Sequence, residues 1–189
     1  IEFIQVVKEL GLIEALDKAV VERAIEYIHN NQQCPPLTIN FSQQTIHSEN
    51  FTTWIKKQLS KPYLKGHLNI EINETAVLND IDHIVQFRDL LKQNEIGFGV
   101  DNFGIHPSGF SYLYAVQPDY IKIDGSLSRE IDNSAEDRFF IRSLITAAHS
   151  LGIQVYAERI ERESQAKELN QLNIDGSQGF LYGRPEALS

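Results

Sequence analysis

The sequence is poor in cysteine, methionine and basic residues, and each shortage narrows what the chain can be. Cys34 is the only cysteine among 189 residues, so an internal disulfide and a cysteine-rich metal centre are excluded, and a reducing compartment is favoured. Methionine is absent altogether, and the chain begins at Ile1 inside a segment with a helical pattern. We therefore expect a fragment or a processed product of a longer protein.

Positive charge is also scarce, with 17 Lys and Arg against 26 Asp and Glu and a net charge of −9. Such a surface repels polyphosphates, which argues against long DNA or RNA as a partner, whereas one small phosphorylated ligand is compatible if metal ions offset its charge. No apolar run approaches the roughly 18 residues of a membrane span, and the first residues do not form a signal peptide. No membrane insertion by this segment is expected. We predict a cytoplasmic location, free or as the cytosolic module of a membrane-anchored protein.

Short β-branched runs alternate with longer amphipathic stretches, in a chain that is 42% hydrophobic and 10% aromatic. This composition predicts one folded domain, and the alternation predicts βα units around a parallel sheet. The expected helices cover residues 12–29, 51–59, 80–93, 111–114, 138–151 and 163–172. The expected strands cover 37–40, 68–72, 96–100, 120–123 and 153–157, followed by a final strand or strand-like turn at 177–181. Gly152 is expected to end the fifth helix.

Six such units in succession favour a (β/α) barrel, with a doubly wound sheet as the alternative. A complete barrel needs roughly 250 residues, so we expect this one to be incomplete at its N-terminus. Trp54 is expected to pack in the core or on a helix face.

Polar side chains stand where each apolar strand ends. They are Asn40, Glu71, Asp101, Asn102, Lys122, Asp124, Glu158, Glu161 and Gln178. One such residue is ordinary, because strands end in polar loops, and Asp124 could be a turn residue. Six successive strand ends of this kind indicate one shared mouth at the carboxyl edge of a barrel.

Oxygen donors of this kind favour Mg²⁺ or Mn²⁺, and a metal-activated hydroxide is the usual means of cleaving a phosphodiester. Lys122 would orient the water or neutralise developing charge. The alternative is that Lys122 forms a Schiff base, as in an aldolase-like barrel. This is disfavoured because nearby carboxylates keep an ammonium charged.

Seven short segments, in order and at consistent spacing, resemble the EAL domain family of bacterial cyclic di-GMP phosphodiesterases. The segments are FIQVVKELGLI (3–13), TINFS (38–42), EINE (71–74), VDNFG (100–104), YIKID (120–124), AERIE (157–161) and QGFLYGRP (178–185). The resemblance implies a modified TIM barrel of the EAL type with its first strand antiparallel, incomplete here. It also implies Mg²⁺- or Mn²⁺-dependent hydrolysis of cyclic di-GMP to linear pGpG, with Ca²⁺ inhibitory.

The resemblance also implies roles for the matching residues. Asn40, Glu71 and Asp101 would hold the metal, with Asn102 and Asp124 in the region of a second ion. Lys122 and Glu158 would position or deprotonate the attacking water, and Gln178 would complete the polar floor. Glu74 would anchor the loop after Asp101, although a simple capping role is the alternative.

Four departures from the family pattern bear on activity. Asn102 replaces the second aspartate of the family's Asp-Asp-Phe-Gly, and an amide is a poorer ligand for a hard dication. The following loop, residues 104–109, contains Pro107 where the family has flexible positions. Arg159 replaces a glycine beside Glu158, where it could pair with that carboxylate or with ligand phosphate. The Glu-Ala-Leu strand itself is absent from the chain.

These observations leave three interpretations: an EAL-type domain that binds cyclic di-GMP with weak or impaired hydrolysis, a fully active phosphodiesterase in the full-length protein, or a non-enzymatic interaction module. The family resemblance further implies a homodimer and attachment to sensory or cyclase domains. Phe180 and Tyr182 are candidates for stacking on guanine, with core packing the preferred role for Phe180.

Overall fold

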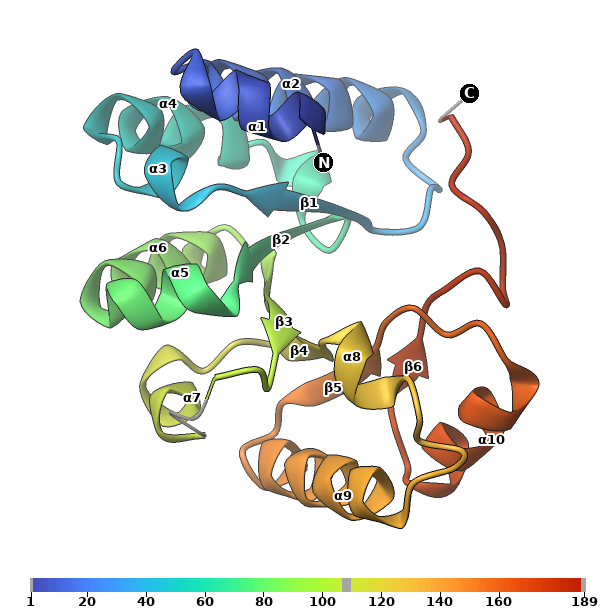
Figure 1. The fold of residues 1–189 in the computed structure, drawn as a ribbon. Coiled ribbons are helices and arrows are strands. Elements are labelled where there is room, and N and C mark those ends of the chain that lie inside the picture. The colour runs from blue at the N-terminus through green and yellow to red at the C-terminus, as the bar shows by residue number, and fades with distance from the viewer. Residues whose placement is uncertain (1, 107–109, 188–189) are drawn as a thin grey trace. The chain divides into compact units, whose positions relative to one another are not determined.

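The computed structural model describes residues 2–106 and 110–187 (Figure 1). The chain divides into two compact units, Ile1–Gly99 and Val100–Ser189, and each is described by itself. Pro107, Ser108 and Gly109, which belong to the altered loop noted above, lie outside the described residues.

The first unit carries helices around the first strands of the sheet. Its elements are α1 (Glu2–Glu9), α2 (Ile13–Asn30), β1 (Leu37–Phe41), α3 (Gln43–Ile46), α4 (Glu49–Leu59), the 3₁₀ helix η1 (Pro62–Leu64), β2 (Leu68–Asn73), α5 (Glu74–Asn79), α6 (Ile81–Gln93) and the first residues of β3 (Gly97–Phe103). Strands β1 and β2 are parallel, with Leu37 opposite Leu68 and Asn40 opposite Glu71, and β3 is the next strand in the sheet.

The core of the first unit forms where alternate strand residues meet the apolar faces of helices. Ile70 and Ile72 of β2 are fully buried, as are Val21 of α2 and Phe51 of α4. The rings of Phe51 and Phe41 pack edge to face, with their centroids 5.2 Å apart. Burial of each such side chain contributes about 1.5–3 kcal/mol to the free energy of unfolding, which fixes the strands that carry Asn40 and Glu71. Trp54 packs at 5.6 Å from Phe51 on the face of α4, as expected.

Strand β2 runs into helix α5 without a loop. Asn73 is the last residue of β2 and also the N-cap of α5, where its side chain accepts a hydrogen bond of 2.9 Å from the Thr75 N–H. The extended backbone of Asn73 and its side-chain oxygen suit this capping role. Glu71 in the strand and Glu74 at the first helical position are therefore held by one continuous piece of regular structure.

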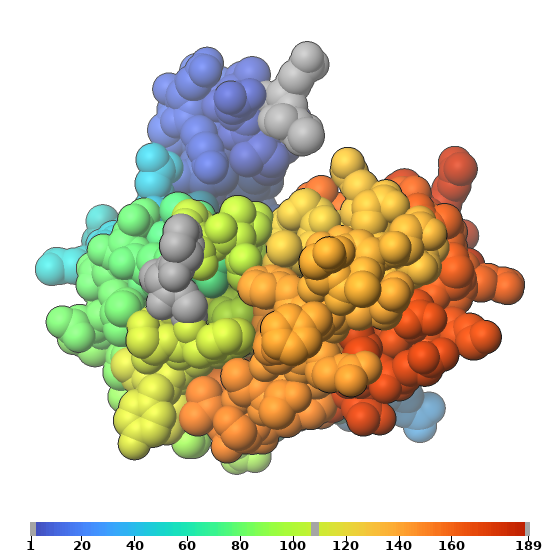
Figure 2. Space-filling model, turned by 60° about the horizontal axis from the view of Figure 1, so that its bottom comes forward, coloured from blue at the N-terminus to red at the C-terminus, as the bar shows by residue number. Residues whose placement is uncertain are grey.

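The second unit repeats the alternation. Its elements are the last residues of β3, α7 (Ser111–Val116), β4 (Tyr120–Ile123), α8 (Gly125–Ser128), α9 (Ala135–Ser150), β5 (Gln154–Ala157), α10 (Glu163–Gln171) and β6 (Gly176–Ser177). The strand order is β3-β4-β5-β6, and both the β4–β5 and the β5–β6 pairs are parallel. Buried strand residues such as Ile121 and Val155 form a core with Leu144 of α9. Helix α9 lies on the face of the molecule that Figure 2 shows. Two of its residues, Phe139 and Phe140, are exposed.

The expected elements are found with shifted ends. Helix α9 begins at Ala135 rather than at 138, because the Ser134 side chain accepts a hydrogen bond from the Asp137 N–H at 3.0 Å. It ends as predicted, with Gly152 at φ +74° and the Ile153 N–H bonded to the Ala148 carbonyl. Helices α3, α5 and α8 were not expected.

Of the strand or strand-like turn expected at 177–181, only Ser177 belongs to a strand, because β6 ends there and residues 180–182 form a turn. Beyond that point the chain follows the segment after β5 instead. The Gln178 N–H donates to the Ala157 carbonyl at 2.8 Å, and the Ile160 N–H donates to the Gln178 carbonyl at 3.0 Å. Among the described residues, no helix combines the length and the apolar character that a bilayer crossing requires.

Candidate active site

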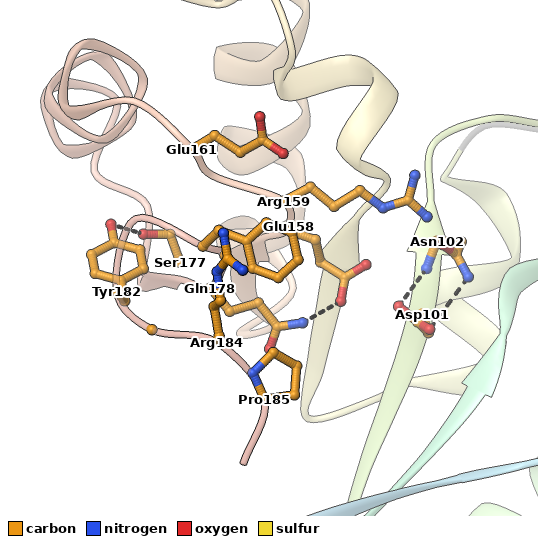
Figure 3. A pocket seen from close by; sticks show the side chains of 13 residues that line it. Asp101, Asn102, Glu158, Arg159, Glu161, Ser177, Gln178, Tyr182, Arg184 and Pro185 are labelled. Atoms are coloured by element: carbon orange, nitrogen blue, oxygen red, sulfur yellow. Dashed lines mark hydrogen bonds between the residues drawn. The ribbon is translucent and has the colours of Figure 1, made fainter.

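A cavity of about 960 Å³ lies in the second unit, at the carboxyl ends of β3, β5 and β6 (Figure 3). It is lined by Asp101, Asn102, Glu158, Arg159, Glu161, Ser177, Gln178, Gly179, Phe180, Tyr182, Gly183, Arg184 and Pro185. The cavity therefore brings together Asp101, Asn102, Glu158, Arg159 and Gln178 of the predicted site, together with Glu161 from the strand-end residues.

Glu158 follows the last residue of β5, and both Gln178 and Lys122 lie against its carboxylate. The Gln178 amide nitrogen donates to Oε1 at 2.5 Å, and the Lys122 ammonium lies 3.8 Å from the same oxygen. The Lys122 and Glu158 side chains are only 14% and 12% exposed, so the attraction is less screened than at an open surface. A carboxylate held in this way is positioned to accept a proton from a water molecule.

Buried hydrogen bonds hold the segment that carries Glu158. The Ser128 hydroxyl donates to the Glu158 carbonyl at 3.1 Å. The side chain of Gln165 is almost fully buried; its oxygen accepts from the N–H groups of Glu161 and Arg162, and its nitrogen donates to the Arg129 carbonyl. The segment between β5 and α10 is thus attached to the segment that follows α8.

A bidentate ion pair reinforces this attachment. Arg162 donates to both carboxylate oxygens of Asp132, at 2.7 and 3.0 Å, and the Ser164 hydroxyl donates to one of them at 2.6 Å. The Arg162 hydrogen bonds, followed by the one from Ser164, hold the pKa of the Asp132 carboxyl well below its usual range. Paired bonds of this geometry orient both partners, so the segment leading away from Glu158 and Arg159 is fixed.

Asp101 and Asn102 stand together at the end of β3. The Asn102 backbone N–H donates to one Asp101 oxygen at 2.8 Å, and its side-chain amide faces the other at 3.3 Å. Asn102 adopts a left-handed conformation, with φ +53°, which asparagine tolerates better than most residues. Asp101 is partly exposed, and each of its oxygens keeps a lone pair for a further ligand.

The remaining predicted residues lie elsewhere. Asp124 is buried and caps α8, accepting from the Ser126 N–H at 2.8 Å; neither it nor Lys122 lines the cavity. In the first unit, the exposed Asn40 lies opposite the buried Glu71 in the β1–β2 register. Glu74 is buried at the start of α5.

The donors at this cavity suit a hard cation in their chemistry. Asp101 and Glu158 offer carboxylate oxygens, the type of ligand that Mg²⁺ and Mn²⁺ prefer. Among the described residues, no group of three or more His, Cys, Asp or Glu side chains is arranged to hold a metal ion. Asp101 and Glu158 therefore offer the right type of donor atom for Mg²⁺ or Mn²⁺, but the described residues do not form an assembled set of metal ligands.

The cavity also contains residues to which sequence reasoning gave no role, and one whose role it misjudged. Phe180 is 62% exposed, so the expected core packing is wrong. It lines the cavity, and the Arg184 guanidinium lies 5.8 Å from the centre of its ring. Tyr182, an expected stacking residue, shares a hydrogen bond of 2.5 Å with Ser177. The motif QGFLYGRP could have indicated that Arg184 lies at the site, because this motif follows the last strand directly.

Parallel strands between helices, with acidic and amide side chains at their carboxyl ends around a cavity, define an α/β protein of the TIM-barrel type. A family model of the EAL domain matches residues 1–185. The chain belongs to the EAL domain family.

Individual relatives agree with this assignment. The chain is 29% identical over 191 residues to the cyclic di-GMP phosphodiesterase PdeA of Borreliella burgdorferi, with 99% of this chain and 28% of PdeA covered. A solved Vibrio cholerae LapD S helix-GGDEF-EAL chain bound to c-di-GMP has a TM-score of 0.85 at 29% identity, covering 93% of this chain and 43% of that one. A manganese/cy-diGMP complex of Klebsiella pneumoniae BlrP1 has a TM-score of 0.76 at 27% identity, covering 95% and 48%. The chain thus spans less than half of each of these relatives. The predicted α/β fold of the EAL type is confirmed.

Proposed function

We propose that this chain is a cyclic di-GMP-binding EAL domain whose Mg²⁺- or Mn²⁺-dependent hydrolysis of the ligand to pGpG is weak. One observation carries the proposal. Glu158 retains both Lys122 and Gln178 as partners, which supports nucleotide binding and proton transfer, whereas Asn102 supplies a neutral amide beside Asp101.

The metal-binding roles rest on the family motif. In this proposal Asn40, Glu71 and Asp101 hold one divalent ion, and Asn102 and Asp124 belong to the region of a second. A bound Mg²⁺ or Mn²⁺ supplies Lewis acidity and lowers the pKa of its water. Ca²⁺ binds the same oxygen donors and is inhibitory.

The chain's own residues perform the proton transfer. Glu158 accepts the proton of the attacking water through its carboxylate, and Lys122 balances the negative charge that develops on the phosphate. Gln178 fixes the rotamer of Glu158 through the bond to Oε1. Glu74 supports the backbone that leads to the site.

Weak hydrolysis follows from Asn102. A neutral amide binds a hard dication less strongly than a carboxylate does, so the second-ion region loses affinity. Loss of one ligand-shell group typically costs about 10–100-fold in metal affinity or activity. Binding of the dinucleotide depends less on that ion and is retained.

The experiment measures binding and turnover separately. Calorimetry with cyclic di-GMP in Ca²⁺ should show binding, and chromatography in Mn²⁺ should show slow formation of pGpG. Glu158→Gln should bind but form no pGpG. Glu163→Gln, on the exposed first turn of α10, is the matched control and should behave like the wild type. Rapid turnover would contradict weak hydrolysis, and absence of binding would contradict the whole proposal.

The second candidate is a fully active phosphodiesterase in a longer protein. It is favoured by the ion pair of Lys122 with Glu158 and by the partly exposed Asp101. Complete absence of pGpG from a longer chain at saturating Mn²⁺ would rule it out. Because the chain covers 28% of PdeA, we also propose that it works in the cytoplasm as one module of a multidomain signalling protein.

A further inference from the structure

Arg159 contributes a positive charge to the cavity beside the carboxylates of Asp101 and Glu158. In Figure 3 its guanidinium extends from the Glu158 side of the cavity toward Asn102. No hydrogen bond or ion pair to this guanidinium comes from any residue that the structure describes. The group is therefore available to a ligand.

Two backbone features hold Arg159 in this position. Its own φ is +57°, a left-handed conformation that costs a residue with a Cβ roughly 1–2 kcal/mol. Gly125 lies directly beneath its side chain: a Cβ at Gly125 would lie 2.6 Å from Arg159 Cδ. The aliphatic part of the Arg159 side chain packs against Gly125 at the start of α8, where a side chain would block it. Its guanidinium can therefore reach the cavity.

Phosphate is the ligand group that this arrangement fits. A guanidinium presents paired N–H donors that match two phosphate oxygens, and it carries its charge at every physiological pH. Exposed aromatic rings at Phe180 and Tyr182 line the same cavity and offer surfaces for a base. The cavity thus combines a fixed cation with aromatic surfaces.

We propose that Arg159 binds a phosphate of the dinucleotide in place of a divalent cation, so that this chain binds cyclic di-GMP without metal. This inference rests on the proposed function, because it names the residue that recognises the same ligand. The neutral Asn102 fits it, since it removes a negative charge where the guanidinium approaches.

The test is titration of cyclic di-GMP in EDTA and again in Ca²⁺. The wild type should bind in both, with affinities within a few-fold of each other. Arg159→Gly should lose on the order of 10- to 100-fold of its affinity in EDTA, and Arg159→Lys should recover part of the loss. Arg142→Gln removes the same charge from the exposed face of α9 and should bind like the wild type.

A second readout separates binding from folding. Because glycine accepts a left-handed backbone without strain, Arg159→Gly should keep or raise the thermal midpoint while it loses affinity. A merely structural arginine would show the opposite: a lower midpoint with unchanged affinity.

Each remaining outcome is decisive. If the wild type binds in Ca²⁺ but not in EDTA, or if Arg159→Gly binds in EDTA like the wild type, the inference is overturned and the proposed function stands. If the wild type binds in neither condition, both fail.

Discussion

Two residues of the cavity, Asn102 and Arg159, combine an unusual backbone with an unusual side chain. Both are left-handed, at φ +53° and +57°, and both depart from the family motif. Asparagine adopts this conformation readily, whereas arginine does so at a cost. The strain at Arg159 is the kind of cost that persists where a side chain performs a task.

At the residue scale, Asn102→Asp should restore hydrolysis. The new carboxylate supplies a negative oxygen donor beside Asp101, and aspartate also tolerates the left-handed backbone. We expect pGpG formation in Mn²⁺ to rise by about 10-fold or more, measured by chromatography under initial-rate conditions.

A matched control and a second measurement make this prediction specific. Asn133→Asp makes the same change at an exposed position outside the cavity and should leave the rate unchanged. Because two adjacent carboxylates repel each other until a cation binds, Mn²⁺ should raise the thermal midpoint of Asn102→Asp more than that of the wild type. An unchanged rate in Asn102→Asp would mean that Asn102 does not limit catalysis.

At the scale of elements, the segments after β5 and β6 position the cavity, and little of this positioning is strand pairing. Backbone bonds join Gln178 and Leu181 to the segment 157–160, and the side chains of Ser128 and Gln165 hold the other side of that segment. The placement of Glu158 therefore depends on contacts outside the sheet.

Gln165→Ala should destabilise the chain and impair the site together. It leaves the Glu161 and Arg162 N–H groups without their partner and removes one of the two hydrogen bonds to the Arg129 carbonyl, at a cost of about 2–3 kcal/mol in the free energy of unfolding. Urea titration measures this cost, and calorimetry measures the accompanying loss of nucleotide affinity. Gln171→Ala, at the exposed end of α10, should change neither quantity; equal effects in the two variants would contradict the assigned role.

Gly179→Ala should separate the two segments that form the cavity. A Cβ at residue 179, where φ is +156°, would lie 2.2 Å from both the backbone nitrogen and the oxygen of Ile160. We expect a loss of about 2 kcal/mol or more in unfolding free energy and a fall in turnover, because Gln178 would be moved from Glu158. At Gly183 a Cβ meets nothing within 4 Å, so Gly183→Ala should be neutral in stability, and a neutral Gly179→Ala would refute the argument.

Sequence periodicity found these elements because their interiors are apolar at regular spacing, as in α9 and β2. It missed the true start of α9, although Ser134 three residues before Asp137 is a recognisable cap. It could not find the role of Gln165, because no local pattern shows that a glutamine near the start of a helix will be buried against a segment more than 30 residues away. The prediction that Phe180 packs in the core was wrong for a related reason: an aromatic residue after a strand is usually buried, and no local pattern shows that this one is exposed.

At the scale of the whole molecule, the charge balance of 17 basic against 26 acidic residues argued against long nucleic acids and was compatible with one small phosphorylated ligand if metal ions offset its charge. The structure adds that two of the basic residues, Arg159 and Arg184, line the cavity together with Asp101, Glu158 and Glu161. Composition cannot reveal this, because it does not record position. The strand-end residues could be predicted since parallel strands bring their carboxyl ends to one edge.

The stability of the whole chain should depend on His47 through pH. Its ring is bonded to the Gln43 carbonyl at 2.7 Å and to Asp80 at 3.0 Å and stacks on His83; chiefly the Gln43 bond, then Asp80, raises the pKa of His47 above its usual value. The contribution of protonated His47 to the free energy of unfolding is therefore complete below the ordinary histidine pKa of about 6.5. It is lost as the pH rises through the pKa of His47 in the folded state.

The difference in unfolding free energy between the wild type and His47→Gln should be larger near pH 5.5 than near pH 8.5, two values that bracket a histidine titration. Urea titrations at both values measure it. His29→Gln, at the exposed end of α2, is the control and should show a smaller dependence. A difference that grows with pH would have the wrong sign and would refute the argument.

The direct passage from β2 into α5 matters for anyone who wishes to turn this chain into a biosensor. A reporter domain inserted at Asn73 would have to break a strand and a helix cap at once, and it would change the spacing of Glu71 and Glu74. The connection between α2 and β1, residues 31–36, is almost entirely exposed and belongs to no regular element. Loop positions of that kind accept insertions with little loss, so a fluorescent module belongs there.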